Sequence, residues 1–408
     1  MVDATASFDG NRLAATEASP RALPRDQAGP STSVVSAEGL TAYAEFCRSA
    51  LFAPAQSAAW VLNWAGQLGP DLLVATLSAE GRPVFSLALE VSGTGPFRVA
   101  RFMGGRHANG NFIAVDPQWL TRPDIPAIRS MLTAITKARP DIDLLALERL
   151  LPDLDGVANP LVSFDHFASP NLSLAVDLAD GFDALLLRAS GKRKRKKHRS
   201  QMRKFEAFGT HRRIEATTAD EVNRLLDAFF EMKEFRFRKM GITNVFGDEQ
   251  VRAFFRALFT QALAEDKPSF VLHGLEVAGK LRAITGSSRS GKRLICEFGA
   301  IAEDDLGHTS PGDFLFFDNI QEACETGFEV YDFSVGDEPY KRLWCDIETQ
   351  HFEVLFPLTL KGRALALTLR QGARLKAVIK NSPTVWKLTK MLRRKAAGQT
   401  AARTEDEG

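Results

Sequence analysis

The segment from Tyr331 to Trp344 constrains the fold more than any other, because it combines a strand, a glycine turn and a helix start. Alternation of apolar and polar residues from Glu329 to Val335 predicts a strand. Its faces would be Asp332 and Ser334 on one side, and Tyr331, Phe333 and Val335 on the other. Gly336 ends the strand, and Pro339 suits the first turn of a helix. Tyr340 and Lys341 should therefore lie near the carboxyl end of that strand, where open α/β sheets commonly hold ligands.

Composition limits the class of protein. The chain has 408 residues, of which 45% are hydrophobic and 25% charged, which is typical of a globular protein with room for two domains. The formal charge of +2 means that any attraction to an anion must come from local clusters of charge. Four cysteines without paired spacing and seven histidines without a ligand motif favour a reducing compartment and no metal.

The sequence shows neither a secretory signal nor an apolar run of the ~20 residues that a membrane span needs. We therefore expect a cytoplasmic protein. Residues 1–38 are rich in Ala, Ser and Pro and hold few large apolar side chains. Such a stretch cannot offset its ordering entropy by burial, so we expect a flexible arm.

A first domain over residues 39–181 should be mixed α and β. Its expected helices are 40–52, 58–64 and 125–138, and its expected strands are 72–77, 83–91, 97–102, 143–147 and 173–176. A loop rich in Gly and Asn, residues 103–112, interrupts this order. Two interpretations stay open for it: a backbone that approaches a ligand closely, and an ordinary turn with left-handed residues.

A basic run dominates the helical segment 182–208, extending from Lys192 to Arg199 and continuing with Arg203 and Lys204. Three interpretations compete: a solvated helix that links two halves, a face that binds phosphate or RNA, and a targeting signal. Aromatic residues that would stack on bases do not interleave with the run.

The second domain, residues 182–358, has a clearer order. Thr218 and Glu221 form a capping box before a helix whose apolar face continues to Phe230. A second helix holds Val251 to Ala262 at helical spacing, and the aromatic stripes of both helices are typical of core. Four strands are expected at 213–216, 270–276, 280–287 and 293–300.

The segment after these strands predicts a helix start that could hold an anion. Ser310 is a good N-cap, Pro311 fits the first helical position, and Gly312 would let a ligand approach the backbone. The free amides and the positive dipole end would then face the ligand. Asp313 either turns back to cap the helix or repels an anion.

The order of these elements resembles GNAT-fold acyltransferases, and within them the CelD-like and FemABX-like branch. The residues that carry the resemblance are Ser310-Pro311-Gly312, Tyr331-Asp332-Phe333, Gly336, Tyr340-Lys341 and Trp344, preceded by the basic helix. The match covers about residues 182–357, and the first half looks similar to the degenerate partner domain of this branch. The resemblance implies an α+β or α/β fold of tandem GNAT-like domains, with mixed central sheets flanked by helices.

The resemblance also implies acyl transfer, with acetyl-CoA or another acyl-CoA held between two splayed strands, 293–300 and 329–335. Its pyrophosphate would lie on loop 307–312. The donor-binding residues carried over are Gly307, His308, Thr309, Ser310 and Gly312 with Phe298 and Gly299. The usual loop has a basic residue or Gln and two further glycines, whereas here only two glycines remain. FemABX-like relatives use aminoacyl-tRNA as the donor instead.

Direct transfer needs a base, donors for the oxyanion and a group that protonates the leaving atom. Glu297 and Asp332 are candidate bases, Tyr340 is the candidate acid, and Lys341 a candidate oxyanion or phosphate contact. Salt bridges to nearby Arg and Lys are the alternative for each carboxylate. No pattern of residues indicates a covalent intermediate.

The last segment, residues 359–408, is basic and amphipathic. It would either lie on an anionic membrane surface or pack on the first domain. Two functions therefore compete: an acyltransferase acting on an amine or hydroxyl of a cell-envelope polysaccharide or its precursor, and a non-catalytic binder of anionic partners through residues 192–204. Nucleic acid is expected as a partner only if the donor is tRNA.

Overall fold

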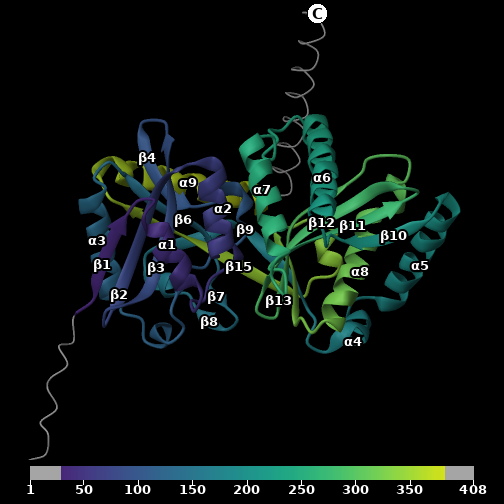
Figure 1. Cartoon of the computed structure of the whole chain (residues 1–408), viewed down its shortest axis with the longest axis horizontal. Helices are drawn as coiled ribbons and strands as arrows, with labels where there is room; N and C mark the ends of the chain where they lie inside the picture. Colours follow the sequence, from purple (N-terminus) through teal and green to yellow (C-terminus); the bar gives the residue numbers. More distant parts are fainter. Residues whose placement is uncertain (1–28, 382–408) are drawn as a thin grey trace, which may run out of the picture.

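The structure is a computed structural model that describes residues 29–381. Its secondary structure follows the order shown in Figure 1. Two lobes, one for each half of the sequence, lie side by side around one long sheet, whose strand order is β1-β2-β3-β4-β6-β15-β9-β14-β13-β12-β11-β10. None of the helices in the described part of the chain combines the length and the apolar character needed to span a bilayer.

The first lobe is an antiparallel meander extended by one parallel strand. Its strands are β1 (Ser31–Val35), β2 (Asp71–Ala79), β3 (Arg82–Thr94), β4 (Phe97–Phe102) and β6 (Leu144–Leu150), with the short β5 (Ala114–Val115) beside β3. Helices α1 (Gly39–Cys47) and α2 (Ala58–Leu68) cover one face, and α3 (Ile125–Ala138) covers the other. The predicted helix 125–138 is confirmed at both ends.

The second lobe repeats this plan. Its strands are β10 (His211–Glu215), β11 (Phe270–Val277), β12 (Lys280–Ser290), β13 (Arg293–Ile301) and β14 (Val330–Val335). Helices α6 (Ala219–Met240) and α7 (Glu249–Ala262) cover one face of the sheet, whereas α4 (Gly181–Arg188), α5 (Gly191–Phe208) and α8 (Pro311–Glu325) cover the other. The crossover from β13 through α8 to the parallel β14 corresponds to β4, α3 and β6 in the first lobe.

Two long strands join the lobes. β9 (His166–Asp177) pairs with β14, and β15 (Ile347–Pro357) pairs with β9 and, from Phe352 onward, with β6. A shared core strengthens the junction, since Trp60 of α2 packs edge-on against Phe254 of α7 with 4.9 Å between ring centroids. The division at residue 181 stays a prediction; β9, which precedes it in sequence, completes the sheet of the second lobe.

Three expectations need correction. Ser31–Val35 forms an edge strand on β2 although it lies in the stretch expected to be a flexible arm, and residues 1–28 lie outside the described residues. The helix expected over 182–208 is two helices, separated at Ser190, whose φ is +57°. Pro339 begins no α-helix; only a 3₁₀ turn, Lys341–Leu343, follows.

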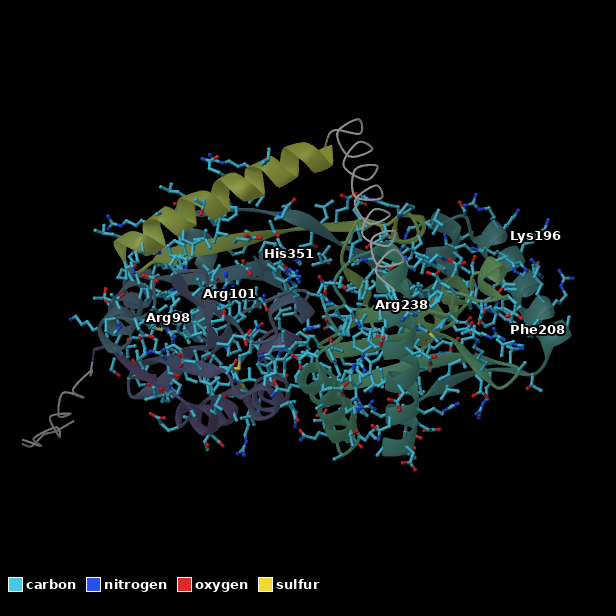
Figure 2. The ribbon with its side chains drawn as sticks, turned by 90° about the horizontal axis from the view of Figure 1, so that it is seen from above. Arg98, Arg101, Lys196, Phe208, Arg238 and His351 are labelled. Carbon is cyan, nitrogen blue, oxygen red and sulfur yellow. The ribbon has the colours of Figure 1, made fainter. Side chains whose placement is uncertain are left out.

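The carboxyl-terminal helix α9 (Leu360–Asn381) packs on the first lobe. Leu365 and Ala366 are buried against Val99, Leu144 and Leu355, while Leu360, Leu367 and Leu375 remain exposed. Figure 2 shows α9 lying along this lobe. The basic segment was expected either to lie on an anionic membrane surface or to pack on the first domain. The described part of α9 packs on the first lobe. The remaining residues of that segment, 382–408, lie outside the described residues.

Candidate functional site

The two parallel strands of the second lobe separate where the sequence placed a ligand. β13 and β14 pair only over three positions, from Arg293 with Val330 to Ile295 with Asp332. From Cys296 to Ile301, β13 has a strand partner only on its β12 side. A β-bulge on β13 lies where this separation begins, because Gly286 pairs with Phe298 and Ser287 with Cys296, which leaves Glu297 over. The splayed pair expected at 293–300 and 329–335 is therefore present.

Glu297, at this bulge, is held from both lobes. Its carboxylate accepts hydrogen bonds from Ser288 Oγ at 2.6 Å and from Asn109 Nδ2 at 2.9 Å. Burial raises the pKa of Glu297 to about 7, the nearby Asp332 adds to the rise, and the two hydrogen bonds reduce it. A carboxylate with such a pKa changes charge near neutral pH, as a general base should.

Asp332 is more fully engaged. Its Oδ1 accepts hydrogen bonds from the Ser334 amide at 2.7 Å and from Ser173 Oγ at 3.2 Å, and its Oδ2 lies 3.0 Å from Arg293 Nη1. The carboxylate thereby ties together β9, β13 and β14 at the point where the strands separate.

The end of β14 is distorted just beyond the point where its backbone pairing with β13 stops. Ser334 adopts a φ of +56°, and its hydroxyl donates a hydrogen bond of 2.8 Å across to the Cys296 carbonyl. Gly336 follows at a φ of +130°, and a Cβ there would lie 2.5 Å from a carboxylate oxygen of Glu338. Only glycine fits this turn without strain.

Tyr340 and Lys341 follow the turn but have different surroundings. Tyr340 is 41% exposed and stacks on Phe316 with 5.6 Å between centroids. Burial of its hydroxyl raises the pKa of Tyr340 above its ordinary value, so the phenol stays protonated. Lys341 is 4% exposed, and its Nζ contacts the carbonyls of Val335 at 3.0 Å and Ser334 at 3.3 Å and the carboxylate of Glu338 at 3.0 Å. These three contacts occupy the three ammonium hydrogens.

The loop before α8 offers few free donors. Between Gly307 and Asp313, the amides of Gly307, Thr309, Ser310 and Asp313 donate to carbonyls within the loop, which leaves those of His308 and Gly312. His308 is exposed, with Nδ1 2.8 Å from the Asp305 carbonyl, and Thr309 Oγ1 donates to the Leu306 carbonyl. A phosphate would therefore find two amides here.

The helix start itself differs from the expectation. Ser310 adopts a φ of +59° and makes no side-chain cap, although Pro311 does occupy the first helical position. A Cβ on Gly312 would lie 2.7 Å from Ile301 Cγ2, so this glycine permits close packing of α8 on β13. Asp313 does not cap the helix but pairs with Lys197 of α5 at 2.8 Å.

Two further positions were carried over to the donor site. Phe298 is buried in the core under α6 and packs on Phe229 with 4.3 Å between centroids. Gly299 continues the unpaired edge of β13, where a Cβ would make ordinary contacts only. The structure thus brings Glu297, Phe298 and Gly299 together on β13, with Asp332 across the splay.

Sequence reasoning missed Asn109 and Lys233. Asn109 lies in the Gly/Asn-rich loop, and its Nδ2 also donates to the Glu297 carbonyl at 2.7 Å, a contact over 188 positions that no local pattern indicates. Lys233 continues the apolar stripe of α6, four positions after Phe229. A lysine in an apolar stripe is the signal that could have revealed it.

The basic helix α5 has an anchored side and a free side. Lys197 pairs with Asp313, and Lys194 donates to the Leu343 carbonyl and lies 4.5 Å above the Trp344 ring. The exposed cations without an ion pair to any described residue are Lys192, Arg193, Lys196, Arg199, Arg203 and Lys204. Figure 2 shows Lys196 at the far edge of the second lobe. The free side of α5 fits the interpretation as a solvated helix surface. The anchored side of α5 holds the start of α8 through Lys197.

Buried histidine near the junction is neutral. His351 on β15 is 1% exposed and lies between the lobes in Figure 2. Burial lowers the pKa of His351 to about 4.

A second histidine, His273, lies with Glu215 and Glu322 in a group of possible metal ligands. Arg213 Nη1 binds Glu322 at 2.9 Å, so a cation already occupies that carboxylate, and we assign no metal there.

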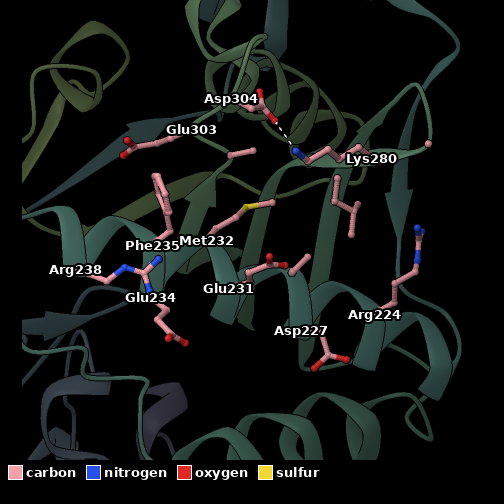
Figure 3. A pocket seen from close by; sticks show the side chains of 14 residues that line it. Arg224, Asp227, Glu231, Met232, Glu234, Phe235, Arg238, Lys280, Glu303 and Asp304 are labelled. Carbon is pink, nitrogen blue, oxygen red and sulfur yellow. Dashed lines mark ion pairs between the residues drawn. The ribbon is translucent and has the colours of Figure 1, made fainter. Parts of the chain in front are cut away.

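One pocket of the second lobe is separate from this site. It has a volume of about 760 Å³ and lies between the outer face of α6 and the ends of β12 and β13 (Figure 3). Acidic and basic side chains surround an apolar floor that includes Met232 and Phe235, and Lys280 Nζ lies 3.3 Å from Asp304. Since it contains none of the candidate catalytic residues, we assign it no part in transfer.

Comparison with known proteins finds one family model and several solved structures that are similar to this chain. Residues 192–342 match the family model described as an acetyltransferase (GNAT) domain. Among solved structures, FemX is 11% identical with a TM-score of 0.56, and the match covers 81% of this chain and 98% of that chain. L-PGS from Bacillus licheniformis is 14% identical with a TM-score of 0.49, covering 83% and 96%. A tandem GNAT protein from the clavulanic acid biosynthesis pathway is 12% identical with a TM-score of 0.45, covering 81% and 99%.

No curated protein matches this sequence. The likeness to FemX shows a shared fold over nearly the whole of both lobes. The family match covers the basic helix, the splayed strands and the turn that carries Tyr340 and Lys341.

Proposed function

Since residues 192–342 match the acetyltransferase (GNAT) domain model, we propose that this chain transfers an acyl group directly from acyl-CoA to an amine or hydroxyl. The observation that carries this proposal is the open splay between β13 and β14, with a carboxylate of raised pKa at its apex. A thioester arm laid along residues 298–301 would use the part of the β13 edge that lies beyond the Cys296 and Glu297 carbonyls, which Ser334 and Asn109 already occupy.

In the proposed reaction, Glu297 accepts the proton of the attacking amine or hydroxyl. Its pKa of about 7 leaves much of it ionised at neutral pH while keeping it basic enough to act. Asn109 and Ser288 hold the carboxylate in place. Tyr340 then donates a proton to the leaving thiolate, because its phenol stays protonated and half exposed beside the splay.

The other two candidates take supporting roles in this proposal. Lys341 has no free hydrogen for an oxyanion, so it fixes the turn that presents Tyr340. Asp332 fixes the distorted end of β14 through the Ser334 amide and Arg293. Both are positioning residues. We further propose a cytoplasmic enzyme whose acceptor belongs to a cell-envelope polysaccharide or its precursor.

A second donor, aminoacyl-tRNA, is favoured by two observations. Only two amides of loop 307–313 remain free for a pyrophosphate. The basic helix α5 lies next to this loop, since its Lys197 and Gln201 contact Asp313 and Thr309. An ester-linked donor would need the same base and acid, and its backbone phosphates could contact α5. If the protein transfers no acyl group, the cationic side of α5 would instead bind anionic partners in a non-catalytic role.

Acyl-CoA hydrolysis and thermal stabilisation separate these functions. We expect acetyl-CoA to raise the melting temperature and to be hydrolysed slowly without an acceptor. Charge reversal at Lys196 and Arg199 should leave both effects unchanged, because neither residue touches the splay. No stabilisation and no hydrolysis at millimolar acyl-CoA would contradict the acyl-CoA proposal. If charge reversal abolishes binding of a polyanion while CoA has no effect, the second donor or a binding role is favoured.

A further inference from the structure

The amine of Lys233 lies in an aromatic environment and forms no ion pair with a described residue. Its Nζ lies 5.6 Å from the ring centroid of Phe229, 5.7 Å from that of Phe237 and 5.9 Å from that of Phe246. It makes no hydrogen bond or ion pair with any residue in the described part of the chain. Cation–π contacts offset part of the cost of desolvating an ammonium, but they supply no full negative charge.

The position of Lys233 in α6 is unusual for a surface lysine. Residues Val222, Leu225, Leu226, Phe229 and Phe230 form the buried stripe of this helix, and Lys233 follows in the same phase. The outer face of α6 lines the separate pocket of Figure 3, so Lys233 points away from that pocket. Its head therefore faces the interior side, where the helix packs on β13.

That interior side is next to the splay. The Phe229 ring under Lys233 packs on Phe298, the residue after Glu297 on β13. Cys296 on β13 and Glu338 on the Tyr340 turn are electrostatic neighbours of the amine, as is Arg236 of α6. Burial and, to a smaller extent, the nearby Arg236 lower the pKa of Lys233 to about 8. The amine of Lys233 therefore lies near Cys296, where the splay begins, and near the turn that carries Tyr340, on the face of the sheet opposite α8.

We propose that Lys233 binds an anionic group, a carboxylate or a phosphate, on the acceptor of the reaction. The role of Lys233 in selecting an acceptor rests on the proposed acyl transfer. The binding of an anion by Lys233 does not depend on it. An anion that enters this aromatic site would supply the missing counter-charge in a poorly solvated place, where such a pair is strong. A neutral acceptor would leave the ammonium unpaired. Lys233 would then select acceptors that carry a negative group beside the reacting amine or hydroxyl.

Chemical labelling of lysines tests this binding without any acyl donor. The full-length protein is treated at pH 8 with limiting acetic anhydride, and labelling of each lysine is measured by peptide mass spectrometry. Inorganic phosphate and acetate serve as the two probe anions. We expect at least one of them to slow the labelling of Lys233 by about threefold or more near saturation. Lys267, an exposed lysine after α7, is the internal control and should be unaffected.

Protection by phosphate alone would indicate a phosphorylated acceptor, and protection by acetate alone a carboxylate. Equal labelling of Lys233 with and without both anions would overturn the proposal. Two variants give a second measurement: anion-induced thermal stabilisation should be lost in Lys233→Met and kept in Lys233→Arg. Equal stabilisation of Lys233→Met and the wild type would also overturn it. Because no acyl donor is present, a failure to bind acyl-CoA leaves this result intact and tests only the proposed function.

Discussion

The two lobes follow the same order of elements but differ where their parallel strands separate. In the first lobe, β4 ends at Phe102, and the chain returns so that Asn111 bridges to Leu150 of β6. The Asn111 amide donates a hydrogen bond to the Arg149 carbonyl, so the backbone around Asn111 fills the gap between β4 and β6. In the second lobe, β13 runs on for six residues beside no β14 partner. The first lobe has thus filled the space that the second lobe keeps open.

The crossover helices differ in the same sense. Asp124 caps α3 by accepting a hydrogen bond from the Ala127 amide, so a carboxylate already occupies that helix start. The start of α8 has no side-chain cap. A filled gap and an occupied helix start leave the first lobe without such an opening, and its Asn109 binds Glu297, the proposed base of the second lobe. In our proposal, the unpaired edge of β13 makes the site, and the repeated fold does not make one by itself.

Replacing the carboxylate at the open splay should have the largest effect. We expect Glu297→Gln to lower kcat/KM by about 100-fold to 1,000-fold, since general bases contribute on this scale. The matched control is Glu90→Gln in the first lobe, another carboxylate whose pKa is raised by burial. It should leave kcat/KM nearly unchanged. Equal losses in the two variants would break the distinction between the lobes.

The pH dependence of stability and of kcat/KM gives a second test of the role of Glu297 in the second lobe. The pKa of Glu297 is raised from 4.5 to about 7, so the folded protein keeps a proton that the unfolded chain releases. Stability from this group is present below pH 4.5 and is lost as the pH rises towards 7. Urea unfolding should show a smaller loss over this range in Glu297→Gln, and wild-type kcat/KM should rise through pH 7. A flat rate profile would argue against Glu297 as the base.

The buried ammonium of Lys341 should matter chiefly for stability. Lys341→Met leaves the carbonyls of Ser334 and Val335 unpaired, and we expect a loss of about 2–3 kcal/mol in the free energy of unfolding. Urea denaturation measures it. Lys239→Met, which removes an exposed ion pair with Glu303, is the control and should cost no more than about 1 kcal/mol. If Lys341→Met keeps full stability but loses binding of the donor, Lys341 is a ligand contact instead.

Two tyrosines, one in each lobe, separate chemistry from stability. The Tyr340 hydroxyl donates to no residue in the described part of the chain, whereas Tyr43 donates to the Gln56 carbonyl at 2.7 Å. Tyr340→Phe should lower kcat by about 10-fold to 100-fold with an unchanged melting temperature. Tyr43→Phe should cost about 1 kcal/mol of stability with unchanged kcat. The opposite pattern would remove Tyr340 from the reaction.

The smallest effect concerns the two helix starts. Asp313→Asn removes a carboxylate from the first turn of α8 and frees Lys197, so CoA should bind a few-fold more tightly by calorimetry. Asp124→Ala should cost about 1 kcal/mol of stability and leave CoA affinity unchanged. Tighter CoA binding in the Asp124 variant would place the donor in the first lobe and would contradict the proposed site.

Regular elements of the fold could be predicted because their patterns are local. The helix at 125–138 and the strands from Phe270 to Ile301 carry the periodicity that burial on one face imposes. Strand β1 escaped prediction because its burial depends on β2, more than thirty residues further along the chain, and three of its five residues are Ser or Thr. Polar edge strands carry little hydrophobic signal.

The site was predictable only in outline. The splayed strands followed from the resemblance, but the bulge at Glu297 depends on the register between β12 and β13, which sequence spacing does not fix. The burial of Lys341 could not be foreseen either, because the carbonyls that it binds become available only when β14 bends at Ser334. Contacts between the lobes, such as that of Asn109 with Glu297, join residues with no local relation.

Hydrogen exchange with and without saturating acetyl-CoA tests the central claim most directly. The account predicts slower exchange in peptides that cover 296–301 and 307–313, on the open edge of β13 and the start of α8. Peptides that cover 111–127, where the first lobe is closed by Asn111 and capped by Asp124, should be unchanged. Protection in the first lobe without protection in the second, or no protection anywhere, would contradict the claim that the second lobe holds an acyl-CoA donor.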